Sequence, residues 1–342
     1  MTTKFQRQLR ENLTAWTFLA PAFLVLLVFW FIPVILALFF SFTDIRQGDR
    51  IFAFNSGGPG GYAWVGLENY ERLMSPGSQG GDREIFLKTF YNSINYVAYS
   101  VPLTLVLSLG LALLLNQKLR GMHFYRTVFF LPHITTWVAI ALVWKQFYNE
   151  HFGVANYLGQ YLFGMPKLAW LNEPRGVVEM LLSGVGITFS EPLHPLIAGP
   201  SLAMFGIVLT NVWYDVGYFV IIFLAGLQNI DASNYEAAEI DGANPVQKFF
   251  YITVPLLSPV IFFLLIISLI NAFKEFIPML IMTPTGGPGG STTTLVFFMF
   301  EKAFGSGSEL GYGAAIAFVI LLIILMVTLL QKVIIGRKVH YS

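Results

Sequence analysis

Long apolar runs, separated by shorter polar segments, dominate the hydrophobic pattern of this chain. Each run holds about 20 residues or more, which is enough for one helix to cross roughly 30 Å of hydrocarbon. The pattern therefore predicts an all-α integral membrane protein with six transmembrane helices. The predicted spans cover residues 14–40, 90–115, 127–148, 201–227, 256–283 and 312–335.

The first run follows Lys4, Arg7 and Arg10, as the apolar part of a signal peptide would. It is too long for that role, and no small-residue cleavage site closes it. We expect an uncleaved spanning helix.

Basic residues are distributed unevenly over the two sides that six spans define. The N-terminus, the loops after the second and fourth spans, and the C-terminal end hold ten Lys or Arg in 63 residues, and the other three loops hold eight in 128. Because Lys and Arg favour cytoplasmic loops, we expect both termini in the cytoplasm. The expected arrangement is a single membrane domain over 1–342, with cytoplasmic segments at 1–13, 228–255 and 336–342 and outer loops at 41–88, 149–200 and 284–311.

Two features of the outer loops carry separate expectations. The segment 176–190 is apolar but too short to span and contains Glu179, so we expect an interfacial or re-entrant piece. GGPGG occurs at 57–61 and again at 286–290, and both are interpreted as flexible turns.

The amino-acid composition excludes several classes of binding and catalytic site. Only 11% of the residues are charged and the net charge is +1, which argues against a nucleic-acid partner. No Cys is present, which excludes disulfides and thiolate metal sites. No Lys follows a Gly, so the GxxxxGK[ST] phosphate loop is absent. The five His show no metal-ligand spacing, and His133 is interpreted as a helix-end residue rather than a ligand. We therefore expect no enzyme site, no metal and no cofactor on this chain.

The stretch NYEAAEIDGANP, residues 234–245, predicts two short helices joined by a glycine elbow outside the bilayer. Ser233 and Glu236 form a capping-box pattern, and Gly242 suits a position with positive φ after the first helix. Asn244 followed by Pro245 is typical of a new helix start. Pro255 and Pro259 are expected to break or kink the chain as it enters the fifth span.

An alanine pair would let a partner's backbone come close to this elbow, and the acids Glu236, Glu239 and Asp241 could meet a basic groove. The alternative is a solvated loop without a partner.

These residues resemble a family signature. E-A-A, three residues, G, nine residues and I-x-L-P is the cytoplasmic signature of the permease subunits of ABC importers served by a substrate-binding protein. Here it reads Glu236-Ala237-Ala238, Gly242, Ile252 and Pro255, with Val254 where Leu is usual. The residues 18–44, 64–73, 111–132 and 223–259 resemble the carbohydrate branch of these permeases, and 174–200 looks like an insertion.

The resemblance implies a type I ABC importer permease fold in a prokaryotic plasma (inner) membrane. The elbow would be the coupling helix that docks on an ATPase subunit. The implied partners are a second, non-identical permease subunit, two cytoplasmic ATPase subunits that bind ATP-Mg, an external substrate-binding protein and the lipid bilayer. The docking residues would be Glu236, Ala237, Ala238, Asp241, Gly242 and Pro255.

Charges inside the spans indicate where a substrate would pass, because they are costly there. Asp215 lies in the fourth span, and Lys274 and Glu275 lie towards the outer end of the fifth. The resemblance implies substrate contacts from these two spans. Aromatic faces beside polar groups suit sugars. The candidate pathway residues are Asn211, Trp213, Tyr214, Asp215, Tyr218, Asn271, Lys274 and Glu275.

A structural interpretation of the same residues stays open at this point. Lys274 could form an ion pair with Asp215, and Trp213 and Tyr218 could serve packing.

The sequence thus favours a permease that imports a sugar, sugar alcohol or glycoside. The alternatives are a glycerol-phosphate importer of the same class, an ion-coupled secondary transporter and a membrane scaffold without transport activity.

Overall fold

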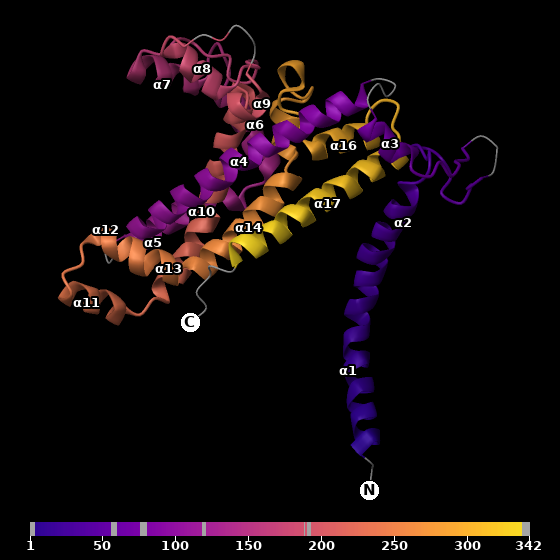
Figure 1. The fold of residues 1–342 in the computed structure, drawn as a ribbon, viewed down its shortest axis with the longest axis horizontal. Helices are drawn as coiled ribbons and strands as arrows, with labels where there is room; N and C mark the ends of the chain where they lie inside the picture. The colour runs from indigo at the N-terminus through magenta and orange to yellow at the C-terminus, as the bar shows by residue number, and fades with distance from the viewer. Residues whose placement is uncertain are drawn as a thin grey trace. The chain divides into compact units, whose positions relative to one another are not determined.

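The computed structural model describes residues 4–55, 60–75, 81–117, 121–187, 189 and 193–336. Over these residues the fold is helical, and the only β structure is three isolated bridges (Figure 1). The chain divides into two compact units. One comprises Met1–Gly80 with Met299–Val319, and the other comprises Gly81–Phe298 with Ile320–Ser342.

The first unit begins with helical segments that follow one another without a break: α1 (Lys4–Leu26), the π-helical η1 (Leu27–Phe31) and α2 (Ile32–Phe40). A short helix, α3 (Glu68–Met74), folds back on the end of α2. The Asn69 side chain donates to the carbonyls of Ser41 and Thr43 at 3.0 and 2.9 Å. Backbone carbonyls at this helix end are therefore satisfied by a side chain from elsewhere in the unit.

The second unit is built around α10 (Leu202–Gln228), which packs along α4 (Asp82–Leu115) and against α5 (Met122–Ile134). Tyr96, Ile207, Phe223 and Leu264 belong to its buried core. Gly217 marks the closest approach of α10 and α5, because a Cβ there would lie 1.8 Å from the carbonyl oxygen of Phe129. Only glycine permits this crossing.

Five helical stretches are long and apolar enough to cross a membrane: Arg10–Phe40, Asp82–Leu115, Leu202–Gln228, Ser258–Met282 and Leu310–Ile334. The span predicted over 127–148 is present as two helices, so the six-span count holds if this pair is one span. There α5 and α6 (Trp137–Phe147) are bent by 98°, so they count as one broken span or a re-entrant pair. Thr135 and Thr136 adopt extended backbone angles, which ends α5 one turn after Pro132.

The fifth predicted span is also interrupted. α14 (Ser258–Lys274) ends at Lys274, and α15 (Ile277–Met282) starts after Glu275 and Phe276. The last span is α17 (Leu310–Ile334), preceded by α16 (Leu295–Phe304).

The remaining helices are short and lie in the connections. Those between the third and fourth spans are α7 (Val154–Phe163), α8 (Val177–Gly184) and α9 (Pro195–Ala198), and those between the fourth and fifth are α11 (Ala232–Ile240), α12 (Pro245–Lys248), η2 (Phe249–Thr253) and α13 (Val254–Leu256). Within the second unit, α11 lies far from α7 and α8: Figure 1 shows α11 at the lower left and α7 and α8 at the upper left. α8 has eight residues, in agreement with the prediction of a short, non-spanning piece at 176–190.

The second GGPGG stretch, which includes η3 (Pro288–Gly290), is a turn, as its composition predicts, and side-chain hydrogen bonds connect it to its surroundings. Asn92 donates to the carbonyls of Gly290 and Thr293, both at 2.9 Å. Thr283 and Thr292 share a hydroxyl hydrogen bond of 2.7 Å across the loop. The glycines let the chain turn with positive φ while these polar side chains hold it in place. Most of the first GGPGG stretch lies outside the described residues.

Candidate functional site

Three helices of the second unit, α4, α10 and α14, leave a narrow polar cleft between them. Its volume is about 20 Å³, the room of about one water molecule. Seven of its ten lining residues carry a hydroxyl, amide or carboxyl group. The polar lining residues are Ser100, Thr104, Asn211, Asp215, Ser268, Asn271 and Glu275.

A chain of hydrogen bonds fixes one side of the cleft. The hydroxyl of Tyr96, which is fully buried, donates to Asn211 Oδ1 at 2.6 Å. Asn211 Nδ2 in turn donates to Asp215 Oδ2 at 2.7 Å. The amide orientation of Asn211 is thereby set, and one carboxylate oxygen of Asp215 is held in place. The other oxygen, Oδ1, lies 3.6 Å from His133 Nδ1.

The break between α5 and α6 places two rings against α10. The imidazole of His133 stacks on Tyr218 with ring centres 4.6 Å apart, and the indole of Trp137 stacks on Tyr214 at 4.5 Å. Trp137 Nε1 donates to Glu275 Oε2 at 3.2 Å. A straight span would carry these two residues along one axis, whereas the bend lets one reach Asp215 and the other Glu275.

The break between α14 and α15 supplies Glu275. The residue follows the last turn of α14 with extended backbone angles, and its carbonyl accepts from the Thr294 hydroxyl at 3.3 Å. Two interrupted helices thus meet at two carboxylates. Interrupted spanning helices and ionisable residues at membrane depth both mark solute sites in transport proteins.

The structure separates the eight predicted pathway residues into three groups. Asn211, Asp215, Asn271 and Glu275 line the cleft. Tyr214 and Tyr218 frame it through their ring stacks. The other two, Trp213 and Lys274, do not line the cleft.

Trp213 is half-exposed and packs on Trp144, with ring centres 5.5 Å apart. The suggested ion pair between Lys274 and Asp215 is not found among the described residues. Lys274 is the last residue of α14 and its side chain is exposed, and the basic group beside Asp215 is His133.

Sequence reasoning did not assign Tyr96, Ser100, Thr104, Trp137 or Ser268 to this site. A signal was present in the second span, where Tyr96, Ser100 and Thr104 recur every four residues on one helix face. His133 does lie at a helix end, as predicted, but it also faces Asp215.

The elbow between the fourth and fifth spans is a second candidate site, and its first cap differs from the prediction. Asp231, not Ser233, is the N-cap of α11, and its carboxylate accepts from the Ser233 N–H at 2.9 Å. This hydrogen bond holds the pKa of Asp231 below its usual value. The cap therefore stabilises α11 fully at pH values above the ordinary pKa of aspartate. This stabilisation is lost as the pH falls through the lowered pKa of Asp231.

The end of α11 is a Schellman motif. Gly242 has a φ of 78°, and its N–H donates to the carbonyl of Glu239 at 3.1 Å. The next N–H, of Ala243, donates to the carbonyl of Ala238 at 2.9 Å. The prediction that Gly242 forms the elbow is confirmed in its geometry.

Asn244 caps the following helix in the predicted way. Its side chain accepts from Gln247 N–H at 2.9 Å, and the Gln247 side chain accepts from Asn244 N–H at 2.8 Å. The second helix is not a separate short one, however. From Pro245 the chain stays helical through η2 and α13 into α14, with a single turn residue at Leu257. Pro255 and Pro259 do not break it, because each stands in the first turn of a segment.

Two contacts attach α11 to this continuous helix. The Tyr235 hydroxyl lies 3.0 Å from Thr253 Oγ1, and Lys248 Nζ lies 2.5 Å from Glu239 Oε1. The outward surface of the elbow joins acidic and apolar groups. Ile240 and Tyr251 are 87% and 79% exposed, and Glu236 and Asp241 are exposed beside them. Apolar residues gathered with charges on an exposed connection are typical of a protein interface.

Comparison with known proteins identifies a family over about three quarters of the chain. Residues 81–340 match the family described as "Binding-protein-dependent transport system inner membrane component". The "Probable ABC transporter permease protein YesP" of Bacillus subtilis is 33% identical over 97% of this chain and 94% of its own length. The "sn-glycerol-3-phosphate transport system permease protein UgpA" of Yersinia pestis bv. Antiqua is 33% identical, covering 82% of each chain.

The fold has a counterpart among solved structures. A chain of the "bacterial alginate ABC transporter in complex with alginate pentasaccharide-bound periplasmic protein" superposes with a TM-score of 0.69 over 95% of both chains, at 19% identity. The predicted helical permease fold is thereby confirmed.

Proposed function

Because this chain belongs to the family of binding-protein-dependent transport system inner membrane components, we propose that it is the transmembrane permease subunit of an ABC importer and that its cargo is a carbohydrate. The observation that carries the cargo class is the cleft, where hydroxyl, amide and carboxylate groups meet at two interrupted helices. These groups accept and donate hydrogen bonds to sugar hydroxyls. The Tyr214 and Trp137 rings beside them offer the apolar faces that sugar C–H groups pack against.

The charge of the cleft favours a neutral cargo. Asp215 and Glu275 are both in its lining, and no Lys or Arg of the described residues lines it. An anionic solute would meet two carboxylates, whereas sugar hydroxyls can donate to them. A neutral saccharide is therefore the first candidate cargo. Glycerol phosphate, which the name of one relative gives as its cargo, is the second.

The elbow supplies the coupling in this proposal. The exposed Glu236, Ile240 and Asp241 would contact a cytoplasmic ATPase subunit, and Tyr235 and Lys248 would pass its movement to the fifth span through their contacts. ATP-Mg would bind to the two ATPase subunits. A second, different permease would complete the pathway. The periplasmic protein bound to the alginate transporter supports an external binding protein as the donor of cargo.

Reconstituted transport tests the proposal directly. Binding proteins from the source genome are first screened against a panel of saccharides and glycerol-3-phosphate by thermal shift, and the one that stimulates ATP hydrolysis by the complex is used for transport. Proteoliposomes that hold both permeases and the ATPase subunits should then take up the best-bound radiolabelled compound only with internal ATP and external binding protein. We expect that compound to be a neutral saccharide. Glycerol-3-phosphate as the imported compound would support the second candidate.

Uptake by this chain alone, driven by an ion gradient, would contradict the importer and favour a secondary transporter. Complete absence of uptake from an assembled complex would favour a scaffold.

The sidedness of the chain is a separate prediction that its lack of cysteine makes simple to test. A membrane-impermeant maleimide added to intact spheroplasts should label Ser183→Cys on α8. The matched variant Ser233→Cys on α11 should react only after the membrane is opened. Both serines are exposed, so accessibility differs by side and not by burial. The reverse labelling pattern would place the termini outside.

A further inference from the structure

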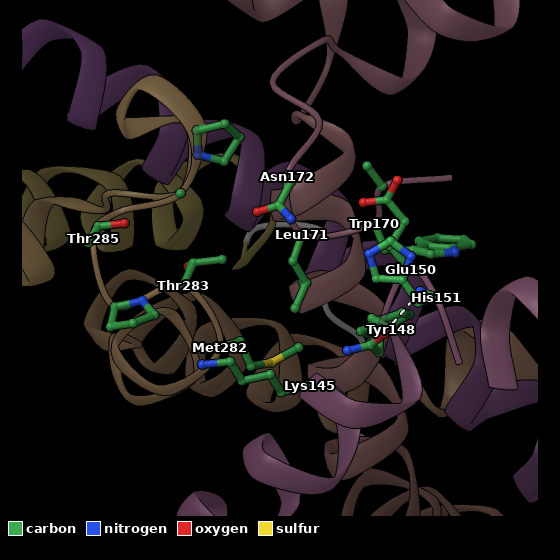
Figure 2. A pocket seen from close by; sticks show the side chains of 15 residues that line it. Lys145, Tyr148, Glu150, His151, Trp170, Leu171, Asn172, Met282, Thr283 and Thr285 are labelled. Atoms are coloured by element: carbon green, nitrogen blue, oxygen red, sulfur yellow. Dashed lines mark hydrogen bonds between the residues drawn. The ribbon is translucent and has the colours of Figure 1, made fainter. Parts of the chain in front are cut away.

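A second and wider hollow, which we call the loop pocket, lies between the connection after α6 and the connection after α15. Its volume is about 460 Å³, within the range of small-molecule sites. Figure 2 shows Thr283 and Thr285 on one side of it and Trp170, Glu150 and His151 on the other. The lining thus mixes aromatic rings with hydroxyl, carboxylate and imidazole groups and the ammonium group of Lys145.

The wall of the loop pocket is held by one buried amide. Asn156 donates to the carbonyls of Glu150 and Leu168 at 3.1 and 2.9 Å. Its Oδ1 accepts from Trp170 Nε1 at 3.0 Å, and the Trp170 ring packs on Tyr148 with centres 5.3 Å apart. The indole is therefore fixed in place before any ligand arrives, and binding needs little further ordering.

Two helices connect the loop pocket to the cleft. α6 starts at Trp137, which contacts Glu275, and near its end Lys145 Nζ donates to the carbonyl of Ile281 at 3.1 Å. α6 and α15 therefore run in the same direction from the cleft to the loop pocket. The six residues of α15 rise about 9 Å, a distance that an oligosaccharide can span.

We propose that the loop pocket is a saccharide subsite that holds one end of the cargo before it enters the cleft. The inference rests on the proposed carbohydrate function. The two volumes favour it, because the cleft has room for about one water molecule whereas the loop pocket is already open. Trp170 supplies the face for a sugar ring, and Glu150 and Asn172 supply polar groups at the exposed rim for its hydroxyls.

Ligand-observed saturation-transfer NMR tests the subsite on the full complex in nanodiscs, without nucleotide or binding protein. The probe is a mixture of maltose, maltotriose, cellobiose and cellotriose. At least one of them should receive saturation from the wild-type complex, and Trp170→Ala should weaken its binding about fivefold or more. Asn172→Ala should also weaken sugar binding. Because the Asn172 side chain is not part of the hydrogen bonds around Asn156, this loss could not come from a change in the pocket wall. Trp170→Phe should retain most of the binding because it keeps a ring on Tyr148.

Tyr157→Ala is the matched control, since Tyr157 is an exposed aromatic of the same connection that does not line the loop pocket. No transfer to any sugar, or transfer unchanged in both Trp170→Ala and Asn172→Ala, would overturn the subsite. A Trp170→Ala complex that loses affinity for the binding protein instead would assign the pocket to protein docking and also overturn it. ATP-driven uptake by the wild-type complex decides the proposed function separately, so the two failures are distinguishable.

Discussion

Asp215→Ala is expected to lower ATP-driven uptake by about tenfold to a hundredfold while the permease still assembles with its ATPase. The carboxylate is held by Asn211 at 2.7 Å and lies 3.6 Å from His133, so it is positioned in the cleft and is not a free surface charge. A hydrogen bond to a charged group contributes about 1.5–3 kcal/mol, which corresponds to that range of rate. Uptake is measured in proteoliposomes, and assembly by co-purification of the ATPase subunit.

Two further variants separate transport from stability at this position. Asp215→Asn keeps an acceptor for Asn211 but removes the charge, so it should preserve assembly as well as Asp215→Ala or better and still reduce uptake. Glu71→Ala removes an exposed carboxylate on α3 and should leave both quantities unchanged. Loss of the assembled complex in both Asp215 variants would assign the residue a structural role.

Hydropathy located the spans because a helix in lipid needs a long apolar run, and each such run is continuous in the sequence. It could not locate the break at Thr135 and Thr136. A sliding average does not register two polar residues in an apolar run, and the bend is stabilised by rings that arrive from α10, far along the chain.

In the candidate site too, features that depend on neighbouring residues were predicted, and features that depend on distant parts of the chain were not. Asp215 and Glu275 were predicted because a charge inside an apolar run stands out in the sequence. Lys274 stands out equally, yet the helix ends there and only the next residue turns to the cleft. Asp231 and Ser233 are both good N-caps, and such local preferences differ too little to fix a boundary within two residues.

Gly242→Pro is expected to lower uptake more than tenfold without removing the permease from the membrane. Proline holds φ near −65°, whereas Gly242 has 78°, and it has no N–H to donate to Glu239. The hydrogen bond to Glu239 would be lost outright, and the change of φ would move the Ala243 N–H away from the Ala238 carbonyl, so the Schellman motif could not form. Because the spans do not depend on this turn, we expect the change to redirect α11 and disconnect it from the ATPase.

Gly242→Ala is the matched control for this variant. A Cβ at this position meets no atom within 4 Å, so alanine costs only the strain of a positive φ, about 1–2 kcal/mol, and it keeps the N–H that donates to Glu239. Uptake should therefore fall much less than in Gly242→Pro. Uptake, ATP hydrolysis and membrane abundance are measured on the same preparations. Normal uptake by Gly242→Pro would show that the elbow has no role in coupling. Loss of both variants from the membrane would instead make Gly242 a folding residue, because then the turn itself, and not its docking surface, would limit function.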